Sequence, residues 1–154
     1  MTILQIVTHP NDILTTPTEE LTKADILSSE IQTLIENMID TCLDADGLGL
    51  AANQVGVGKS LIICRKPGTN QFDTIINPKI VHAEGSMHSK GEGCLSLPGQ
   101  HFNIKRFKKI TVTGLAADGE TLMIGTKSKR FAKIVQHELD HLDGFTLLNR
   151  GKKV

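Results

Sequence analysis

Residues 128–144 read SKRFAKIVQHELDHLDG, and they carry the clearest helical pattern in the chain. Apolar side chains recur there at steps of three and four residues, which is the period of a helix with one buried side. Gly144 stands where a helix commonly ends. We therefore predict a helix from Ser128 to Leu142. Its apolar side consists of Phe131, Ile134, Val135, Leu139 and Leu142.

The same predicted helix contains the pattern His-Glu-x-x-His. Because successive residues turn by about 100° around a helix, His137 and His141 should lie one turn apart on one face. Two imidazoles placed in this way can bind one metal ion, and Glu138 can then reach a metal-bound water without being a ligand itself. The pattern predicts a catalytic metal site. The alternative interpretation is a polar helix face that matches by accident.

A third ligand must come from upstream of this helix. One class of metal-dependent peptidases has a third histidine six residues after the second, but this chain has Leu147 at that position. Another class takes a glutamate further downstream as its third ligand, and no Glu follows His141 in this sequence. Cys94 is the best upstream candidate, because its glycine-rich surroundings, GEGCLSLPG at 91–99, permit a close approach to the helix. Cys42 and Cys64 fall in apolar segments and are expected to be small buried residues.

The rest of the chain predicts one more long helix and several short strands. Residues Ser28–Asp46 repeat apolar side chains with a helical period, and Ser29 is the expected start. Residues 84–101 are rich in glycine and are expected to be too irregular for a core element. This order of elements indicates an α+β fold rather than alternating βαβ units. We expect strands at 61–64, 74–76, 80–83, 110–115 and 121–124, the last two joined by a turn at Asp118-Gly119.

A segment of small residues, GLGLAANQ at 47–54, ends in an amide side chain. It imitates a dinucleotide-binding pattern, but it follows a predicted helix rather than a strand, so we reject that interpretation. The nearby GVGKS at 56–60 lacks the first glycine of a phosphate-binding loop, because Asn53 stands in its place. The segment is instead suited to a close approach of substrate backbone, with Gln54 pointing at a carbonyl group.

Composition and charge exclude several function classes. The chain has 154 residues, the size of one domain, and its 17 basic and 17 acidic side chains cancel, which argues against binding to DNA or to a membrane surface. The first ten residues lack the charge pattern of a signal peptide, so we expect a cytoplasmic protein. One basic cluster is expected to be a solvent-exposed strand face, with weak docking to ribosomal RNA as the alternative; it consists of Lys105, Arg106, Lys108 and Lys109.

Three segments taken together, GLGLAANQ at 47–54, EGCLS at 92–96 and QHELDHLDG at 136–144, resemble the three signature motifs of peptide deformylase, in that family's order. The resemblance implies a single catalytic domain over residues 1–154, with antiparallel sheets around a central helix that carries His-Glu-x-x-His. It also implies a hydrolase that removes the N-terminal formyl group from formyl-methionyl nascent peptides and releases formate.

The resemblance assigns a role to each candidate site residue. Glu138 would be the general acid and base, while Gln54 and the backbone N–H of Leu95 would stabilise the oxyanion. The implied metal ligands are Cys94, His137 and His141. The implied substrate-binding residues are Leu48, Gly49, Glu92 and Ile134. Ferrous iron is the expected ion, with Zn²⁺, Ni²⁺ or Co²⁺ as substitutes, and a thiolate ligand suits iron or zinc better than magnesium or calcium.

Three basic residues depart from the family pattern. Lys90, Arg130 and Lys133 stand near positions where members of this family commonly have apolar residues around the methionine side chain. They either extend into solvent or favour acidic or polar residues further along the substrate. The chain also stops about a dozen residues after His141, as compact members of the family do, and we expect it to act as a monomer.

Two other functions stay open at this stage. A small peptidase that cuts internal peptide bonds would use the same two histidines, although its usual downstream ligand is missing. A binding module with a structural metal site would normally need a fourth protein ligand, and the sequence shows no candidate near the other three.

Overall fold

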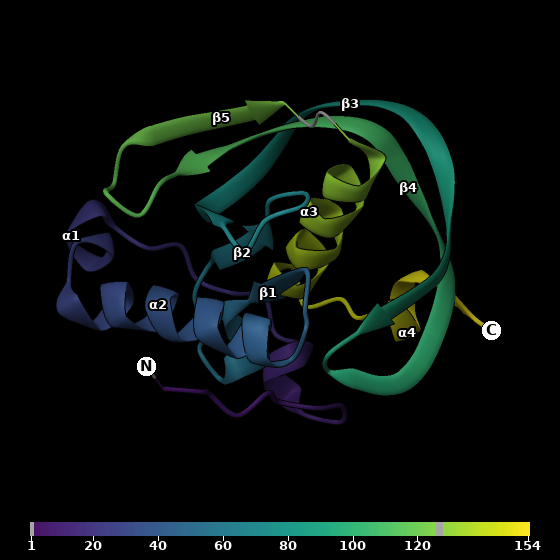
Figure 1. Ribbon diagram of the computed structural model, residues 1–154, viewed down its shortest axis with the longest axis horizontal. Helices are drawn as coiled ribbons and strands as arrows, with labels where there is room; N and C mark the ends of the chain where they lie inside the picture. The colour runs from purple at the N-terminus through teal and green to yellow at the C-terminus, as the bar shows by residue number, and fades with distance from the viewer. Residues whose placement is uncertain (1, 126–127) are drawn as a thin grey trace.

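The computed structural model describes residues 2–125 and 128–154, and it has an α+β fold. Figure 1 shows helix α3 (Lys129–Leu142) inside the curve of two long strands. All strand pairs in the described ranges are antiparallel, in the order β1-β2-β3-β4-β5, with β6 paired to β4. The strands are β1 (Gly49–Ala51), β2 (Leu61–Arg65), β3 (Phe72–Cys94), β4 (Leu97–Leu115), β5 (Thr121–Gly125) and β6 (Lys152–Lys153).

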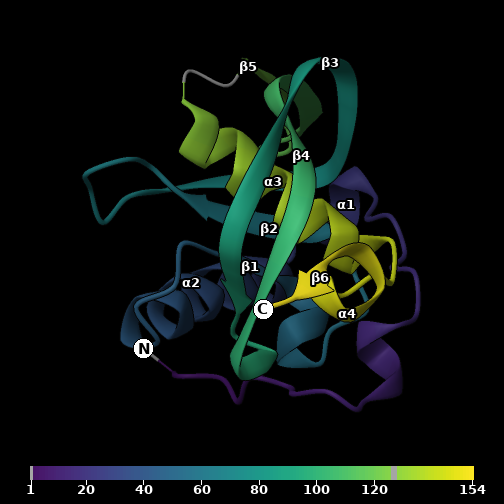
Figure 2. The ribbon, with the colours of Figure 1, turned by 90° about the vertical axis from the view of Figure 1, so that its right-hand side faces the viewer.

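The expectation for residues 84–101 was wrong, because most of this segment belongs to β3 and β4. The two strands form a long ribbon, which Figure 2 shows lengthwise. Their pairing shifts register at four points, and Gly85 and Gly91 adopt positive φ angles within β3. Such irregularities bend and twist a ribbon without ending it. For the same reason the described strands form one six-stranded curved sheet, where several sheets were expected.

Both long helices are confirmed. The Ser28 side chain caps α2 (Ser29–Asp44), which begins at the expected Ser29. The Ser128 hydroxyl caps α3 by accepting a hydrogen bond from the Phe131 N–H, and Gly144 follows α3 with a φ of 78°. Four short helical segments were not predicted: η1 (Asp12–Leu14), α1 (Lys23–Ile26), η2 (Ala52–Val55) and α4 (Leu147–Arg150).

The core consists mainly of two apolar clusters that meet at β2. Leu61 and Ile63 belong to the cluster that includes α2, whereas Ile62 and Cys64 belong to the cluster that includes α3. This alternation is the two-residue period of a strand that is buried on both faces. The sheet therefore holds α3 firmly in place. None of the helices in the described part of the chain is long and apolar enough to cross a membrane.

The expected hairpin between β4 and β5 is also confirmed. The strands pair from Leu115 and Thr121 outward, and Gly119 adopts a φ of 79° in the connecting turn. Cys42 and Cys64 are both fully buried, as their apolar surroundings predicted.

Candidate metal centre and active site

The end of β3 and one face of α3 bring together three side chains that are able to bind a metal ion. The Cys94 Sγ lies 3.2 Å from the His141 Nε2, which lies 3.3 Å from the His137 Nε2. The possible ligand atoms of these three residues all lie within 4.8 Å of one another. Tetrahedral zinc or iron with ordinary bond lengths separates such ligand atoms by about 3.3–3.6 Å. The donor types and their spacing therefore fit one divalent ion.

Local backbone structure explains how these ligands converge. The two histidines are four residues apart on α3, so their side chains lie one turn apart on one face, with ring centroids 5.0 Å apart in an edge-to-face arrangement. Cys94 is the last residue of β3, directly after a register shift in its pairing with β4. The thiol therefore reaches α3 from a strand end, rather than from the long loop that the glycines had suggested.

Glu92 holds one of the two histidines in place. Its carboxylate lies 2.7 Å from the His137 Nδ1 and also pairs with the Arg106 guanidinium. The Glu92 side chain is only 4% exposed, and both its oxygens have partners. Although burial opposes ionisation, the hydrogen bonds from His137 and Arg106 lower the pKa of Glu92 to about 2. Glu92 also lines the cavity that opens onto the centre, so the expectation that it contacts substrate stays a prediction.

Arg106 departs from the expectation of a solvent-exposed basic face. It is buried, and its guanidinium bridges Glu92 and Asp140, with Nη1 lying 2.6 Å from the Asp140 Oδ2. Arg150 approaches the other oxygen of Asp140 at 2.7 Å. A chain of ion pairs therefore runs from the surface to His137. The other three basic residues of the cluster, Lys105, Lys108 and Lys109, are exposed as expected.

Glu138 lies beside the candidate ligands and is almost completely buried. Its Oε2 has no hydrogen-bond partner among the described residues, and burial raises the pKa of Glu138 to about 7. A Cβ atom on Gly49 would come within 2.6 Å of the Glu138 Oε1. A side chain at position 49 would therefore collide with the Glu138 carboxylate, which explains structurally why glycine stands there.

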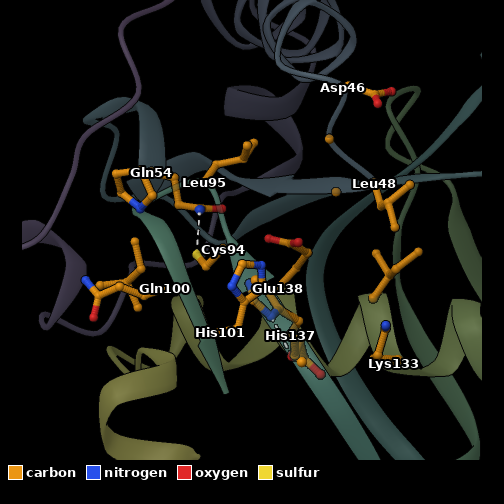
Figure 3. A pocket seen from close by; sticks show the side chains of 18 of the residues that line it. Asp46, Leu48, Gln54, Cys94, Leu95, Gln100, His101, Lys133, His137 and Glu138 are labelled. Carbon is orange, nitrogen blue, oxygen red and sulfur yellow. Dashed lines mark hydrogen bonds and ion pairs between the residues drawn. The ribbon is translucent and has the colours of Figure 1, made fainter. Parts of the chain in front are cut away.

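Gln54 is held in a fixed position at the other side of the centre. Its Oε1 accepts a hydrogen bond from the Ala51 N–H, while its Nε2 donates to Ser96 at 3.1 Å and contacts the Cys94 Sγ at 3.5 Å. Figure 3 shows Gln54 and Leu95 on the same side of Cys94. The amide donor is thus aimed at the centre by contacts with its own neighbourhood.

Without a metal ion, the pKa values of the two buried histidines are shifted in opposite directions. Burial and the neighbouring His137 charge lower the pKa of His141 well below its usual value. Burial also opposes the charging of His137, but hydrogen bonds to Cys94 and Glu92 raise its pKa well above the usual value. Metal ligands must be unprotonated, so metal binding at this centre is expected to release a proton.

A cavity of about 430 Å³ opens onto the centre. Lys133 also lines it, whereas Arg130 lines a neighbouring cavity and Lys90 is exposed and lines neither. His141 lies behind the lining and is 1% exposed. Nine of the residues singled out from the sequence line the cavity: Leu48, Gly49, Gln54, Glu92, Cys94, Leu95, Ile134, His137 and Glu138.

Three supporting residues escaped the sequence reasoning. Ser96 orients Gln54, Asn53 donates a hydrogen bond to the His141 carbonyl at 2.6 Å, and Arg106 orients Glu92. A signal existed for Arg106, because it continues an alternation of buried residues with Phe102 and Ile104 along β4. The other two stand within the segments quoted from the sequence, Asn53 in 47–54 and Ser96 in 92–96, although no role was predicted for either.

Comparison with known proteins covers nearly the whole chain. The family model described as polypeptide deformylase matches residues 3–154. The chain is 41% identical to a peptide deformylase of Aquifex aeolicus, over 97% of this chain and 88% of the relative. It resembles the crystal structure of a peptide deformylase from Ehrlichia chaffeensis in complex with actinonin, with a TM-score of 0.90, 36% identity, and coverage of 97% and 89% of the two chains. A Thermotoga maritima peptide deformylase gives a TM-score of 0.90 at 29% identity, with 99% of both chains covered.

Proposed function

The chain belongs to the polypeptide deformylase family, and from this premise we propose that it removes the formyl group from nascent peptides at the centre formed by Cys94, His137 and His141. Peptide deformylases are metal-dependent hydrolases of formylated peptides. The observation that carries the proposal is the placement of Glu138 and Gln54 in the same cavity as the thiol and imidazole donors. The helix with His-Glu-x-x-His is thus the central element of the proposed site.

Cys94, His137 and His141 would hold one divalent ion, which supplies Lewis acidity for hydrolysis when it is bound. We propose ferrous iron as the natural ion, with Zn²⁺, Ni²⁺ or Co²⁺ as substitutes, because a thiolate with two imidazoles suits these ions better than magnesium or calcium. Glu92 fixes the ring of His137 through Nδ1, so that Nε2 faces the other two donors.

Glu138 is the proposed general base and acid. Its oxygen without a protein partner can accept a proton from the attacking water, whose oxygen then bonds to the formyl carbon. The same carboxyl group returns the proton to the amine nitrogen as the C–N bond breaks, releasing formate and a free N-terminus. A pKa of about 7 suits both directions of transfer at neutral pH.

Gln54 and the backbone N–H of Leu95 are the proposed donors to the oxyanion that develops on the formyl oxygen. Hydrogen bonds to Ala51 and Ser96 hold the Gln54 amide in place before substrate binds. One such preplaced donor commonly contributes about 3 kcal/mol to catalysis.

The substrate main chain is proposed to bind along β1, with Gly49 as its partner. β1 is the first strand of the sheet, and among the described residues it pairs with β2 alone, which leaves its other edge available to an extended peptide. Leu48 and Ile134 line the cavity and are the proposed contacts for the apolar side chain of formyl-methionine.

The function is tested with the variant Glu138→Gln. We expect a fall in turnover of formyl-Met-Ala-Ala of at least about a hundredfold, because the variant cannot move a proton, while bound metal stays at one ion per chain. An exposed glutamate supplies the matched control, Glu120→Gln, which should leave turnover unchanged. Equal turnover in the Glu138→Gln variant would refute the proposed role.

The other two functions fit the centre less well. Structural zinc sites use four protein ligands, whereas the cluster found within residues 2–125 and 128–154 has three members. A peptidase that cuts internal bonds would be recognised by cleavage of a blocked peptide that has no formyl group.

We further propose one catalytic domain over residues 1–154, acting as a cytoplasmic monomer on N-formylated nascent peptides and binding neither DNA nor membrane. The balanced charge supports the part of this proposal that excludes DNA and membrane binding. Weak association with the ribosome stays a prediction. The exposed basic face available for it is smaller than the sequence suggested, because Arg106 is buried.

A further inference from the structure

A second cavity, of about 370 Å³, lies beside the metal cavity and shares Leu48 and Ile134 with it. The rest of its wall comes from the segment 65–70, between β2 and β3, and from Arg130 on α3. Three of its lining residues are cationic, and none of the described lining residues is Asp or Glu: the cations are Arg65, Lys66 and Arg130. A peptide that leaves the metal centre past Leu48 and Ile134 therefore meets a positively charged wall.

Two of the four cations near this passage have no ion-pair partner among the described residues. Arg65 lies 3.5 Å from an Asp46 oxygen, and Lys66 lies 3.4 Å from an Asp73 oxygen. By contrast, Arg130 and Lys133 form no ion pair with any residue in the ranges that the structure describes. Lys133 is half-buried in the wall of the metal cavity, and Figure 3 shows it on the same side of the centre as Leu48.

The stability of α3 does not explain why Arg130 and Lys133 stand near its N-terminal end. Both stand in the first two turns of α3, whose first turn contains no acidic residue. The N-terminal end of a helix favours negative charge, so cations there cost stability rather than add to it. A negatively charged ligand that binds beside them would compensate for this cost.

We propose that the second cavity binds a carboxylate of the formylated substrate, and that Arg130 and Lys133 select for it. This inference rests on the proposed deformylase function, since the two cavities are joined by the residues that would contact formyl-methionine. The ligand class is an acidic side chain on the formylated residue itself or on one that follows it. Arg130 supplies a planar guanidinium suited to a carboxylate, and Lys133 supplies a point charge at the entrance.

The test compares peptide amides in which Glu or Gln stands at the first, second or third position after the formyl group, all assayed with the full-length, metal-loaded protein. Amidated C-termini remove the terminal carboxylate, and the position scan separates the two sources of the acidic group. At low ionic strength we expect kcat/KM to be about fivefold higher for Glu than for Gln at one position or more. The preference should shrink in 0.5 M NaCl because salt screens the interaction.

Charge-removing variants assign the preference to these residues. The double variant Arg130→Gln/Lys133→Gln should bring the Glu-to-Gln ratio of kcat/KM close to one when the two peptide amides are compared in the same variant. Lys129→Gln is the matched control, because Lys129 lies on the same helix, is exposed and lines neither cavity. It should keep the wild-type ratio. A persistent preference in the double variant would overturn the assignment.

The outcomes distinguish this inference from the proposed function. Hydrolysis of neutral formyl peptides with a Glu-to-Gln ratio near one at every position would refute the carboxylate site and leave the deformylase function standing. If no formyl peptide is hydrolysed, the function fails, and binding of the same peptides, measured by fluorescence anisotropy, decides the carboxylate site. Tighter binding of the acidic peptides would then support it, and equal binding would overturn it.

Discussion

The His137 Nδ1 lies 2.7 Å from the Glu92 carboxylate, and this hydrogen bond leaves the opposite ring nitrogen facing Cys94 and His141. The interaction fixes both the rotation of the ring and the nitrogen that is available to a metal ion. Partners of this kind strongly influence metal affinity, because they orient the ligand and raise its basicity. Glu92 thus acts on the centre through His137.

Replacing this carboxylate should weaken metal binding. In the variant Glu92→Gln, the amide is a weaker partner for His137, so we expect metal affinity to fall by about ten- to a hundredfold. Titration of the metal-free protein against a chelator of known affinity measures the change. Glu84→Gln, an exposed glutamate on the same strand, is the control and should bind metal like the wild type. Unchanged affinity in Glu92→Gln would contradict the role of Glu92.

The buried ion pairs of Arg106 predict a loss of stability that depends on pH. Arg106→Met leaves Glu92 and Asp140 without their shared partner, and breaking a buried pair in this way costs about 3–5 kcal/mol. Urea unfolding of the metal-free protein at pH 7 measures this cost. Lys109→Met removes an exposed pair with Glu84 and should change stability by no more than about 0.5 kcal/mol.

The sign of the pH effect follows from the lowered pKa of Glu92. A carboxylate whose pKa is about 2 in the folded protein, against a usual 4.5, contributes stability above pH 4.5 and loses it as the pH falls towards 2. The difference in unfolding free energy between the wild type and Arg106→Met should therefore narrow over that range. A constant difference from pH 7 to pH 2 would show that the pKa of Glu92 does not depend on Arg106.

The three cysteines should differ sharply in reactivity. Cys42 and Cys64 are fully buried, and burial raises the pKa of Cys42 to about 12 and that of Cys64 well above its usual value. Almost no thiolate exists on either at pH 8, whereas Cys94 is only half-buried. A thiol-specific chromogenic reagent should modify one thiol rapidly in the folded metal-free protein. Zinc should protect that thiol, and the denatured protein should show three.

The two long helices could be predicted from the sequence because each carries a local period that needs no information from elsewhere in the chain. The α3 pattern also contains both histidines and Glu138, so these candidate site residues could be placed on one helix together. Hydrogen bonds to the side chains of Ser28 and Ser128 cap the N-terminal ends of α2 and α3. Where neighbouring residues alone determine an element, the sequence pattern is sufficient.

The long β3–β4 ribbon could not be predicted in the same way. Its pairing joins residues up to about forty positions apart, such as Ile76 and Leu115, and its register shifts at several points. Glycines that usually mark loops act here as bends within strands. The orientation of Glu92 and the burial of Arg106 depend on that register, so their contacts with each other and with α3 appear only in the folded chain.

Gly49 lies so close to Glu138 that no side chain fits between them. In Gly49→Ala the added Cβ would lie 2.6 Å from the Glu138 Oε1 and 2.8 Å from the Ile134 Cγ2, so the carboxylate must move. A displacement of about 1 Å at a reacting group can cost a hundredfold in rate, and we expect kcat/KM on formyl-Met-Ala-Ala to fall by about that factor with metal content unchanged. The control is Gly58→Ala, because a Cβ on Gly58 would meet nothing within 4 Å and its φ is not positive. Wild-type activity in Gly49→Ala would show that Glu138 can act from another position, whereas equal losses in both variants would indicate a general effect of replacing glycine rather than a clash with the catalytic carboxylate.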